Sequence, residues 1–184
     1  AEVGQHLPDW RPQQDYRKGV SARKDLGGGA LLELSHELDY VRWLMGDVAS
    51  VSSRLTKQSN LEIDVEDSAD LILEFTNEVV GTVHPDMVRQ PPARNCVVSG
   101  SEGTAEWDGP GSGSRIWSAK TREWRDLSSG SADRNDMYMA ELRQFLACMA
   151  GEEEVVTTGI DGKRVLELIL AARESSEFGK VVVL

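Results

Sequence analysis

The feature that most constrains the fold is a succession of short segments, between residues 48 and 127, in which apolar and polar residues alternate. The clearest case is residues 69–75, where the apolar positions Ala69, Leu71, Leu73 and Phe75 alternate with Asp70, Ile72 and Glu74. A repeat of two residues is the period of a strand with one face against a core. Short turns such as Asn77-Glu78 join neighbouring segments, as in antiparallel pairs. The sequence therefore predicts a largely antiparallel sheet.

The same criteria place the other strands. After a short mixed segment at residues 2–8, we expect strands at residues 48–55, 69–75, 79–84, 96–99, 104–107, 116–117, 123–127 and 181–184. Gly100–Gly103 and Lys120-Thr121 would form turns, and Gly109–Ser114 a loop.

Apolar residues spaced by three and four predict helices on either side of this block. Residues 30–45 form the first, which Gly46 would end. Two more follow the strands, the second with Asp161 as its N-terminal cap and Gly179 at its end. Their stripes are Leu31, Leu34, Leu38 and Val41; Tyr138, Leu142, Phe145, Leu146 and Met149; and Val165, Leu168, Ile169 and Ala172. The fold class is therefore α+β, an open, mostly antiparallel sheet with helices packed on one face, in one domain over residues 1–184.

Composition excludes some classes of partner. The 184 residues carry a formal net charge of −11, which disfavours binding to nucleic acid and to anionic membranes. No apolar stretch approaches the roughly 20 residues of a membrane span. Cys96 and Cys148 lie among apolar neighbours without a CxxC spacing, so we expect two buried, reduced thiols and a cytoplasmic protein. The chain has no signal-peptide pattern and no initiating Met, which suggests a fragment or a processed product.

One polar cluster stands out as a candidate for chemistry. Glu33, His36 and Asp39 recur at spacings of three on the expected helix, which would make them neighbours on one side. Flanking carboxylates orient a histidine and stabilise its charged form, as a general acid–base requires. The alternative is an ordinary surface histidine among carboxylates. Gly27-Gly28-Gly29 just before the helix would allow close approach of a backbone or a ligand, but it lacks the strand–GxGxxG–helix context of a nucleotide site.

Residues 9–26, here called the arm, are polar, basic and aromatic. A long loop of this kind inside a domain is often functional. Trp10, Arg11, Tyr16 and Arg17 are residue types that bind a sugar or its acidic group. A packed surface arm explains them equally well.

The segment from Gly27 to Gly46, GGGALLELSHELDYVRWLMG, resembles the one that opens the C-terminal domain of the glucose–fructose oxidoreductase/inositol 2-dehydrogenase/MocA family. The resemblance extends over nearly the whole chain. Its further landmarks are Glu66-Asp67, Asn77-Glu78, Gly100–Thr104, Glu174-Ser175 and Gly179–Val182.

The resemblance implies a domain like the C-terminal domain of glyceraldehyde-3-phosphate dehydrogenase. It also implies a Rossmann domain, absent from this chain, that binds NAD or NADP and ends in a Glu-Lys-Pro motif. We therefore expect no cofactor on this fragment and no activity from it alone. A sugar-type small molecule would be the substrate, and the sheet would form a homo-oligomer, often a dimer.

Roles for individual residues follow from the same resemblance. His36 matches the catalytic histidine, which takes the proton of a substrate hydroxyl as hydride leaves for the nicotinamide. Glu33 matches the family's acid, although the family usually has Asp four residues before the histidine. Asp39 matches the second acid and would bind substrate or hold the helix, while Arg11 and Tyr16 are our substrate-binding candidates from the arm.

Two other readings stay open. The changed spacing between Glu33 and His36 is compatible with a non-catalytic oligomerisation or interaction module derived from the family. A metal-dependent hydrolase would need a His/carboxylate cluster, and His6, His36 and His84 are not spaced as one.

Overall fold

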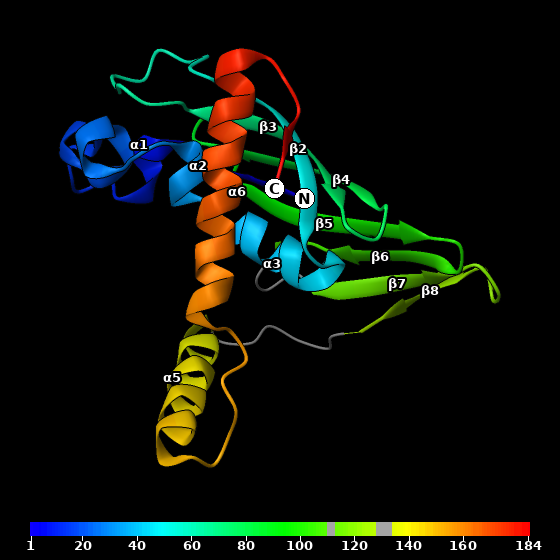
Figure 1. Cartoon of the computed structure of the whole chain (residues 1–184). Coiled ribbons are helices and arrows are strands. Elements are labelled where there is room, and N and C mark those ends of the chain that lie inside the picture. Colours follow the sequence, from blue (N-terminus) through cyan, green and yellow to red (C-terminus); the bar gives the residue numbers. More distant parts are fainter. Residues whose placement is uncertain (110–112, 128–133) are drawn as a thin grey trace. The chain divides into compact units, whose positions relative to one another are not determined.

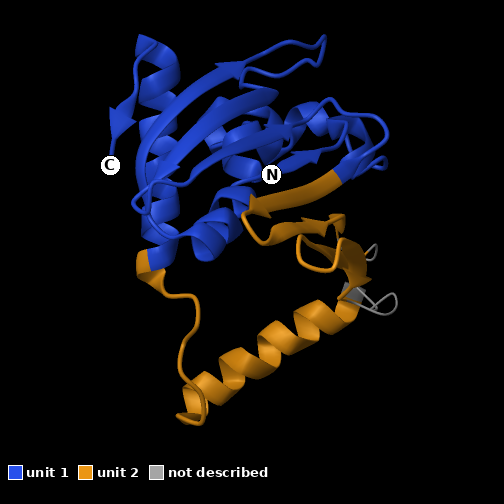
Figure 2. Ribbon diagram, turned by 90° about the vertical axis from the view of Figure 1, so that its right-hand side faces the viewer, with its two compact units in different colours: residues 1–93, 161–184 blue, residues 94–160 orange. Residues whose placement is uncertain are grey.

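A computed structural model of the chain describes residues 1–109, 113–127 and 134–184. It divides into two compact units, the first formed by residues 1–93 and 161–184 and the second by residues 94–160 (Figure 2). Each unit is described by itself below. The expectation of one domain over residues 1–184 stays a prediction.

The first unit is built on strands in the order β1-β4-β3-β2-β9. Neighbours pair antiparallel, except that β1 pairs parallel with β4, which the sequence pattern did not predict. The strands are β1 (Glu2–Gly4), β2 (Val48–Thr56), β3 (Ser68–Phe75), β4 (Val80–Asp86) and β9 (Val182–Val183).

Strand β3 shows how alternation sets the two faces of this sheet. Leu71, Leu73 and Phe75 are buried, whereas Ile72 between them is 54% exposed. The turn to β4 runs through Glu78, whose φ of 67° lies in the left-handed region. The hairpin predicted at Asn77-Glu78 is therefore confirmed, and one face of the sheet is covered while the other is open.

Helices α3 (His36–Met45) and α6 (Gly159–Phe178) lie on the covered face (Figure 1). Asp161 lies in the first turn of α6, so its prediction as the cap was wrong: the helix begins two residues earlier, and the Asp161 carboxylate pairs with Arg42 at 3.3 Å. The core joins these helices to the sheet through Leu31, Leu38, Val41, Val48, Val51, Ala69, Leu71, Leu73, Phe75, Val83, Val165, Leu168, Ile169, Ala171 and Ala172.

The expected helix over residues 30–45 is interrupted. A four-residue helix, α2 (Ala30–Glu33), ends at Leu34, whose N–H bonds the Ala30 carbonyl, and α3 starts after Ser35. Leu34, at φ −107° and ψ 24°, departs from helical geometry. Gly46 ends α3 as predicted, with φ 94° and its N–H bonded to the Arg42 carbonyl.

The arm is folded and packs against a small hydrophobic core. It contains the end of α1 (Leu7–Trp10) and the 3₁₀ turns η1 (Tyr16–Lys18), η2 (Val20–Ala22) and η3 (Lys24–Leu26). The buried residues of this core are Leu7, Ala22, Ala30, Leu61 and Met87, of which only Ala22 belongs to the arm, and Trp10 and Tyr16 pack against them. Trp10 and Tyr16 thus pack as the packed-arm reading expects, whereas Arg11 and Arg17 are exposed, and a role of the arm in binding stays a prediction.

The second unit contains four strands and a helix. β5 (Ala93–Gly100, begun at Ala93 in the first unit), β6 (Gly103–Trp107), β7 (Ser114–Ser118) and β8 (Glu123–Asp126) pair antiparallel in chain order. Trp117 and Trp124 face each other across the last pair, with ring centroids 5.7 Å apart. Residues 110–112 of the expected loop lie outside the described residues. Helix α5 (Arg134–Ala150) follows.

These elements confirm the α+β class with a mostly antiparallel open sheet. Neither cysteine forms a disulfide, and Cys96 is buried as expected. The expected burial of Cys148 was wrong: its side chain, on α5, is half-buried. No helix in the described part of the chain combines the length and hydropathy needed to cross a bilayer.

Candidate active site

The glycines before α2 bring the arm and the polar cluster together. Gly29 has a φ of 113°, and a Cβ there would lie 2.3 Å from a carboxylate oxygen of Glu66. The Glu66 Oε1 accepts a bond from the Leu31 N–H at 3.3 Å, and its backbone carbonyl accepts one from the Ala30 N–H. A carboxylate of the chain itself therefore lies at the start of α2 and bonds the backbone there.

Glu33 closes α2 and faces the arm. Its Oε2 accepts a hydrogen bond of 2.8 Å from the Ser21 hydroxyl, and the side chain is half-buried. Because α2 ends at Glu33 and α3 begins at His36, the two residues do not share one regular helix. The predicted unbroken helix was wrong here, and the reason is the turn at Leu34 and Ser35.

His36 begins α3 with 46% of its side chain exposed. Its Nε2 lies 3.4 Å from Oε1 of Glu37, a carboxylate that is completely buried. A fixed carboxylate beside an imidazole orients the ring, which suits a group that moves a proton. Asp39 is half-buried one turn further along α3, so it keeps the predicted spacing to His36.

A pocket on the arm contains both substrate candidates. Its volume is about 380 Å³, and Arg11, Tyr16, Trp10 and Ser21 are among its lining residues. Two lining side chains are fixed from outside: the Trp10 indole N–H bonds the Gln5 carbonyl, and the Tyr16 hydroxyl accepts a bond from the Glu62 N–H. Ser21 connects this pocket with Glu33 through the hydrogen bond described above.

The arginines of the arm differ in their partners. Arg17 pairs with Asp15 at 2.8 Å and with Glu62 at 2.9 Å. Hydrogen bonds to Asp15 and Glu62 raise the pKa of Arg17, and the Arg17 guanidinium lowers that of Asp15. Within the residues that the structure describes, no carboxylate lies within ion-pair distance of the Arg11 guanidinium. Arg11 is therefore the better placed of the two to meet an anionic or hydroxylated ligand.

The structure thus brings some of the predicted site residues close to one another. Arg11 and Tyr16 share the arm pocket, with Glu33 one hydrogen bond away, whereas His36 and Asp39 do not line it. Across the described ranges, no group of three or more His, Cys, Asp or Glu side chains could hold a metal ion.

Two residues of this region were missed. Glu37 comes three residues after Leu34 and four before Val41, a position on the apolar stripe that pointed to burial. Ser21 gave no signal, because its partner Glu33 is 12 residues away and only the folded arm brings them together.

Comparisons with known proteins agree with the fold. The family model described as "Oxidoreductase family, C-terminal alpha/beta domain" matches residues 3–184. No curated protein sequence matches the chain.

Solved structures give the same result. A levoglucosan dehydrogenase in complex with NADH has a TM-score of 0.87 at 18% identity, over 99% of this chain and 56% of its own. An aldose-aldose oxidoreductase from Caulobacter crescentus, complexed with glycerol, has 0.81 at 20%, over 100% and 54%. The WlbA dehydrogenase from Bordetella pertussis, with NADH and UDP-GlcNAcA, has 0.74 at 22%, over 100% and 54%.

This chain thus spans little more than half the length of each of these structures. At identities this low, the structural similarity supports only the fold, and membership of the family rests on the match to the family model. The chain belongs to the glucose–fructose oxidoreductase/inositol 2-dehydrogenase/MocA family of oxidoreductases, as its C-terminal α/β domain.

Proposed function

We propose that this chain is the substrate-binding and oligomerisation domain of an NAD(P)-dependent oxidoreductase. The substrate would be a sugar, cyclitol or sugar derivative that reacts at a hydroxyl or keto group. The observation that carries this proposal is the family match over residues 3–184. Solved relatives are described with NADH together with levoglucosan, L-sorbose or UDP-GlcNAcA, which favours a sugar-type substrate.

The described residues do not fit a dinucleotide. The three glycines follow a 3₁₀ turn, and the helix start behind them is already bonded to Glu66. NAD or NADP would instead be held by a Rossmann domain of the full-length protein, where the nicotinamide accepts or returns hydride. We therefore propose that residues 1–184 alone bind no NAD and catalyse no turnover.

This chain would supply proton transfer and substrate contacts. His36 would accept a proton from the substrate hydroxyl, or return it to the carbonyl oxygen, with its ring oriented by Glu37. Glu33, held by Ser21, and Asp39 would bind or orient the substrate near this ring. Arg11 and Tyr16 would bind substrate hydroxyl or acidic groups in the arm pocket.

The open face of the first unit's sheet would pair with another copy of the chain. Ile72 and Val80 are 54% and 65% exposed there, beside the hydrogen-bonded pair of His84 and Asp70 at 2.7 Å. Apolar side chains on an uncovered sheet face favour association.

The proposal is tested with the full-length protein and a panel of sugars and cyclitols. We expect the absorbance of the reduced nicotinamide to rise when NAD or NADP is supplied with an oxidisable substrate. Calorimetry should detect NAD binding to the full-length protein and none to residues 1–184. Tight NAD binding by residues 1–184 would contradict the proposal that a separate Rossmann domain holds the cofactor.

A second candidate function is a non-catalytic oligomerisation module. The break between Glu33 and His36, and the position of His36 outside the arm pocket, favour it. A full-length chain that binds cofactor and forms oligomers, but oxidises or reduces nothing in the panel, would support this reading.

The arm pocket makes a prediction of its own. Arg11→Ala in the full-length enzyme should raise KM about tenfold with little change in kcat, because the lost contact is made equally in the ground and transition states. Arg17→Ala, whose guanidinium is already paired with Asp15 and Glu62, is the matched control and should change KM less. An unchanged KM for the Arg11→Ala enzyme would mean that the arm is not part of the substrate site.

A further inference from the structure

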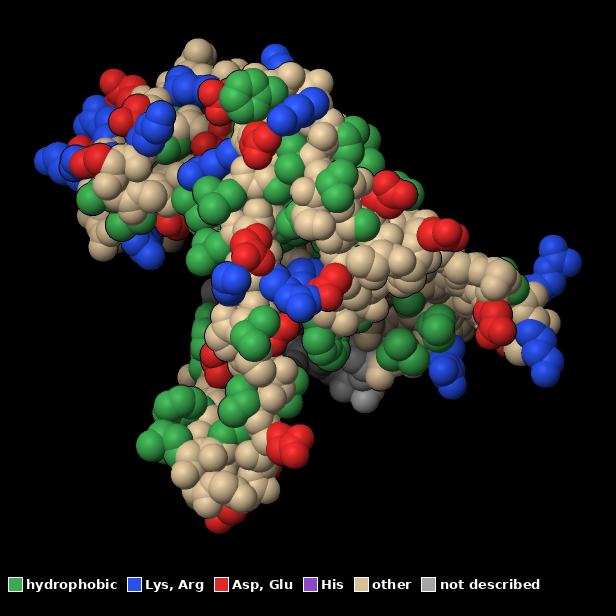
Figure 3. Space-filling model, in the orientation of Figure 1, with side chains coloured by type: hydrophobic (Ala, Val, Ile, Leu, Met, Phe, Trp, Pro, Cys, Tyr) green, Lys and Arg blue, Asp and Glu red, His purple; other side chains and the backbone are tan. Residues whose placement is uncertain are grey.

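The arm pocket carries more positive than negative charge. Arg11 and Lys18 both line it, and Asp15 is the only carboxylate among the described residues that do. The charge of Asp15 is already engaged, because the Arg17 guanidinium bonds its Oδ1 at 2.8 Å and its Oδ2 at 3.1 Å. Figure 3 shows Lys and Arg side chains at the surface of the arm, on the left of the view. The pocket therefore presents two cations to a molecule that enters it.

Neither cation is neutralised by a direct ion pair. In the described part of the chain, no carboxylate lies within ion-pair distance of the Lys18 amine or of the Arg11 guanidinium. Hydrogen bonds from Arg17 lower the pKa of Asp15, and the charge of Lys18 adds to that effect without a contact. The whole chain has a formal net charge of −11 and so repels anions. A local excess of positive charge offsets this repulsion at one place, the arm pocket.

The other walls of the pocket suit a sugar ring. Trp10 and Tyr16 line it, and their rings offer a large apolar surface to the C–H groups of a sugar. The Trp10 indole N–H bonds the Gln5 carbonyl at 2.8 Å, and the Tyr16 hydroxyl accepts a bond from the Glu62 N–H at 3.2 Å. Both rings are therefore held in place before a ligand arrives, which lowers the cost of binding. The volume of about 380 Å³ suits a single sugar ring.

We propose that the substrate is an acidic sugar, a monosaccharide whose carboxylate or phosphate group is bound by Arg11 and Lys18. The inference rests on the proposed function and narrows its substrate from sugars in general to those that carry an anionic group. A planar guanidinium donates two parallel hydrogen bonds to a carboxylate or a phosphate, and an amine contributes a point charge beside it. The hydroxyl groups of the same sugar would meet Ser21, which connects the pocket with Glu33.

The test is calorimetric titration of the full-length protein, with NADH present, with neutral sugars and their acidic counterparts. Glucose and galactose are compared with the corresponding uronates and sugar phosphates. At least one acidic sugar should bind about tenfold more tightly than its neutral counterpart, because hydrogen bonds between charged groups contribute more than neutral ones. Preference for the uronate or for the phosphate identifies which acidic group the site takes. Equal affinity for neutral and acidic sugars, or no binding of any acidic sugar, would overturn the proposal.

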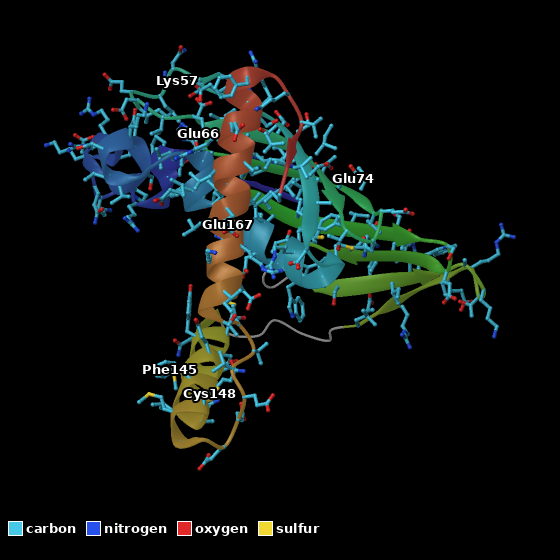
Figure 4. The ribbon with its side chains drawn as sticks, in the orientation of Figure 1. Lys57, Glu66, Glu74, Phe145, Cys148 and Glu167 are labelled. Carbon is cyan, nitrogen blue, oxygen red and sulfur yellow. The ribbon has the colours of Figure 1, made fainter. Side chains whose placement is uncertain are left out.

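A pair of variants assigns the preference to the pocket. Lys18→Gln should raise the Kd of the acidic sugar at least about threefold and leave that of the neutral sugar unchanged, because it removes one charge at an exposed site. Lys57→Gln is the matched control: Lys57 is also exposed, but it lies on the segment between β2 and β3, outside the arm pocket (Figure 4). Equal losses for the two variants would mean that only the overall charge matters, and would overturn the assignment.

Hydride transfer separates this inference from the proposed function. A full-length enzyme that oxidises or reduces neutral sugars, but no acidic ones, would keep the proposed function and overturn the acidic substrate. A protein that binds acidic sugars as expected, but transfers hydride to or from none of them, would keep the ligand class and contradict the proposed function.

Discussion

At the scale of single residues, the contact between Gly29 and Glu66 organises the region around the candidate site. Gly29 has φ 113° and ψ 151°, a conformation essentially restricted to glycine. The carboxylate of Glu66 fills the space where a side chain would be and bonds the first turn of α2. The glycine at position 29 thus makes room for a carboxylate of the protein itself.

The first prediction concerns this contact. Gly29→Ala should lower the free energy of unfolding by about 2 kcal/mol, because it adds backbone strain and displaces the Glu66 carboxylate from the helix start. Gly27→Ala is the control: Gly27 also has a positive φ, 82°, but a Cβ there would meet nothing within 4 Å. It should cost about 1 kcal/mol. Equal losses for both variants in urea unfolding would show that Glu66 is unimportant.

The sequence predicted types of residue at this scale better than their contacts. His36 and Glu33 stood out because polar residues interrupt an apolar pattern. Their relation depended on an unbroken helix, and neither propensity nor spacing revealed the turn at Leu34 and Ser35. Tertiary packing overrides local propensity at such a turn, so the local sequence carries no signal for it.

At the scale of elements, an ion-pair cluster ties α3 and α6 to the start of β2. The Asp47 carboxylate pairs with Arg164 and, at 3.0 Å, with Arg42, whose side chain is only 11% exposed. Hydrogen bonds from Arg164 and then Arg42 lower the pKa of Asp47 below its ordinary value. The cluster therefore stabilises the fold only while Asp47 is ionised.

The second prediction follows from that direction. A lowered folded-state pKa means that the stabilisation is fully present above the unfolded pKa of about 3.9 and is lost as pH falls through the folded value. Asp47→Asn should lower the free energy of unfolding by about 1 kcal/mol near neutral pH, since the carboxylate is half exposed to solvent. The difference should vanish as the medium is acidified.

Urea unfolding of Asp47→Asn and wild type across this pH range is the measurement. Glu167→Gln removes an exposed pair with Lys163 inside α6 and should cost less than about 0.5 kcal/mol. A loss for Asp47→Asn that stays constant down to the acid limit would mean that the carboxylate charge is not its source.

The helices and strands differ in how well the sequence predicts them, and the reasons are physical. Strand β3 was predictable because it buries alternate residues over a local stretch. The parallel pairing of β1 with β4 was not predictable, because residues 2–4 and 84–86 are far apart in the sequence and no local pattern indicates that they pair. The short helix α1 was hidden because four residues give no helical period.

At the scale of the whole molecule, the proposed function leaves the open sheet face of the first unit to be covered. That face is proposed to meet another copy of the chain. The sequence pattern identified the strands of this sheet, but not which of its two faces would lack a partner. That depends on which apolar residues the remaining chain covers.

The third prediction tests the open face. Ile72→Asp should shift the full-length protein toward monomer in sedimentation, because it places a charge at the centre of an interface that loses water. Val20→Asp alters a residue that is 50% exposed on the arm and should leave the oligomer unchanged. A full-length Ile72→Asp protein with the wild-type mass would place the interface elsewhere.

The central claim is that this domain supplies the proton-transfer residue of a sugar oxidoreductase, and His36→Ala tests it most directly. Single-turnover hydride transfer in the full-length enzyme should slow by about 10²–10⁴, while NADH affinity and melting temperature stay near wild type. That pattern separates loss of proton transfer from loss of folding or cofactor binding. A transfer rate within about twofold of wild type would contradict the claim.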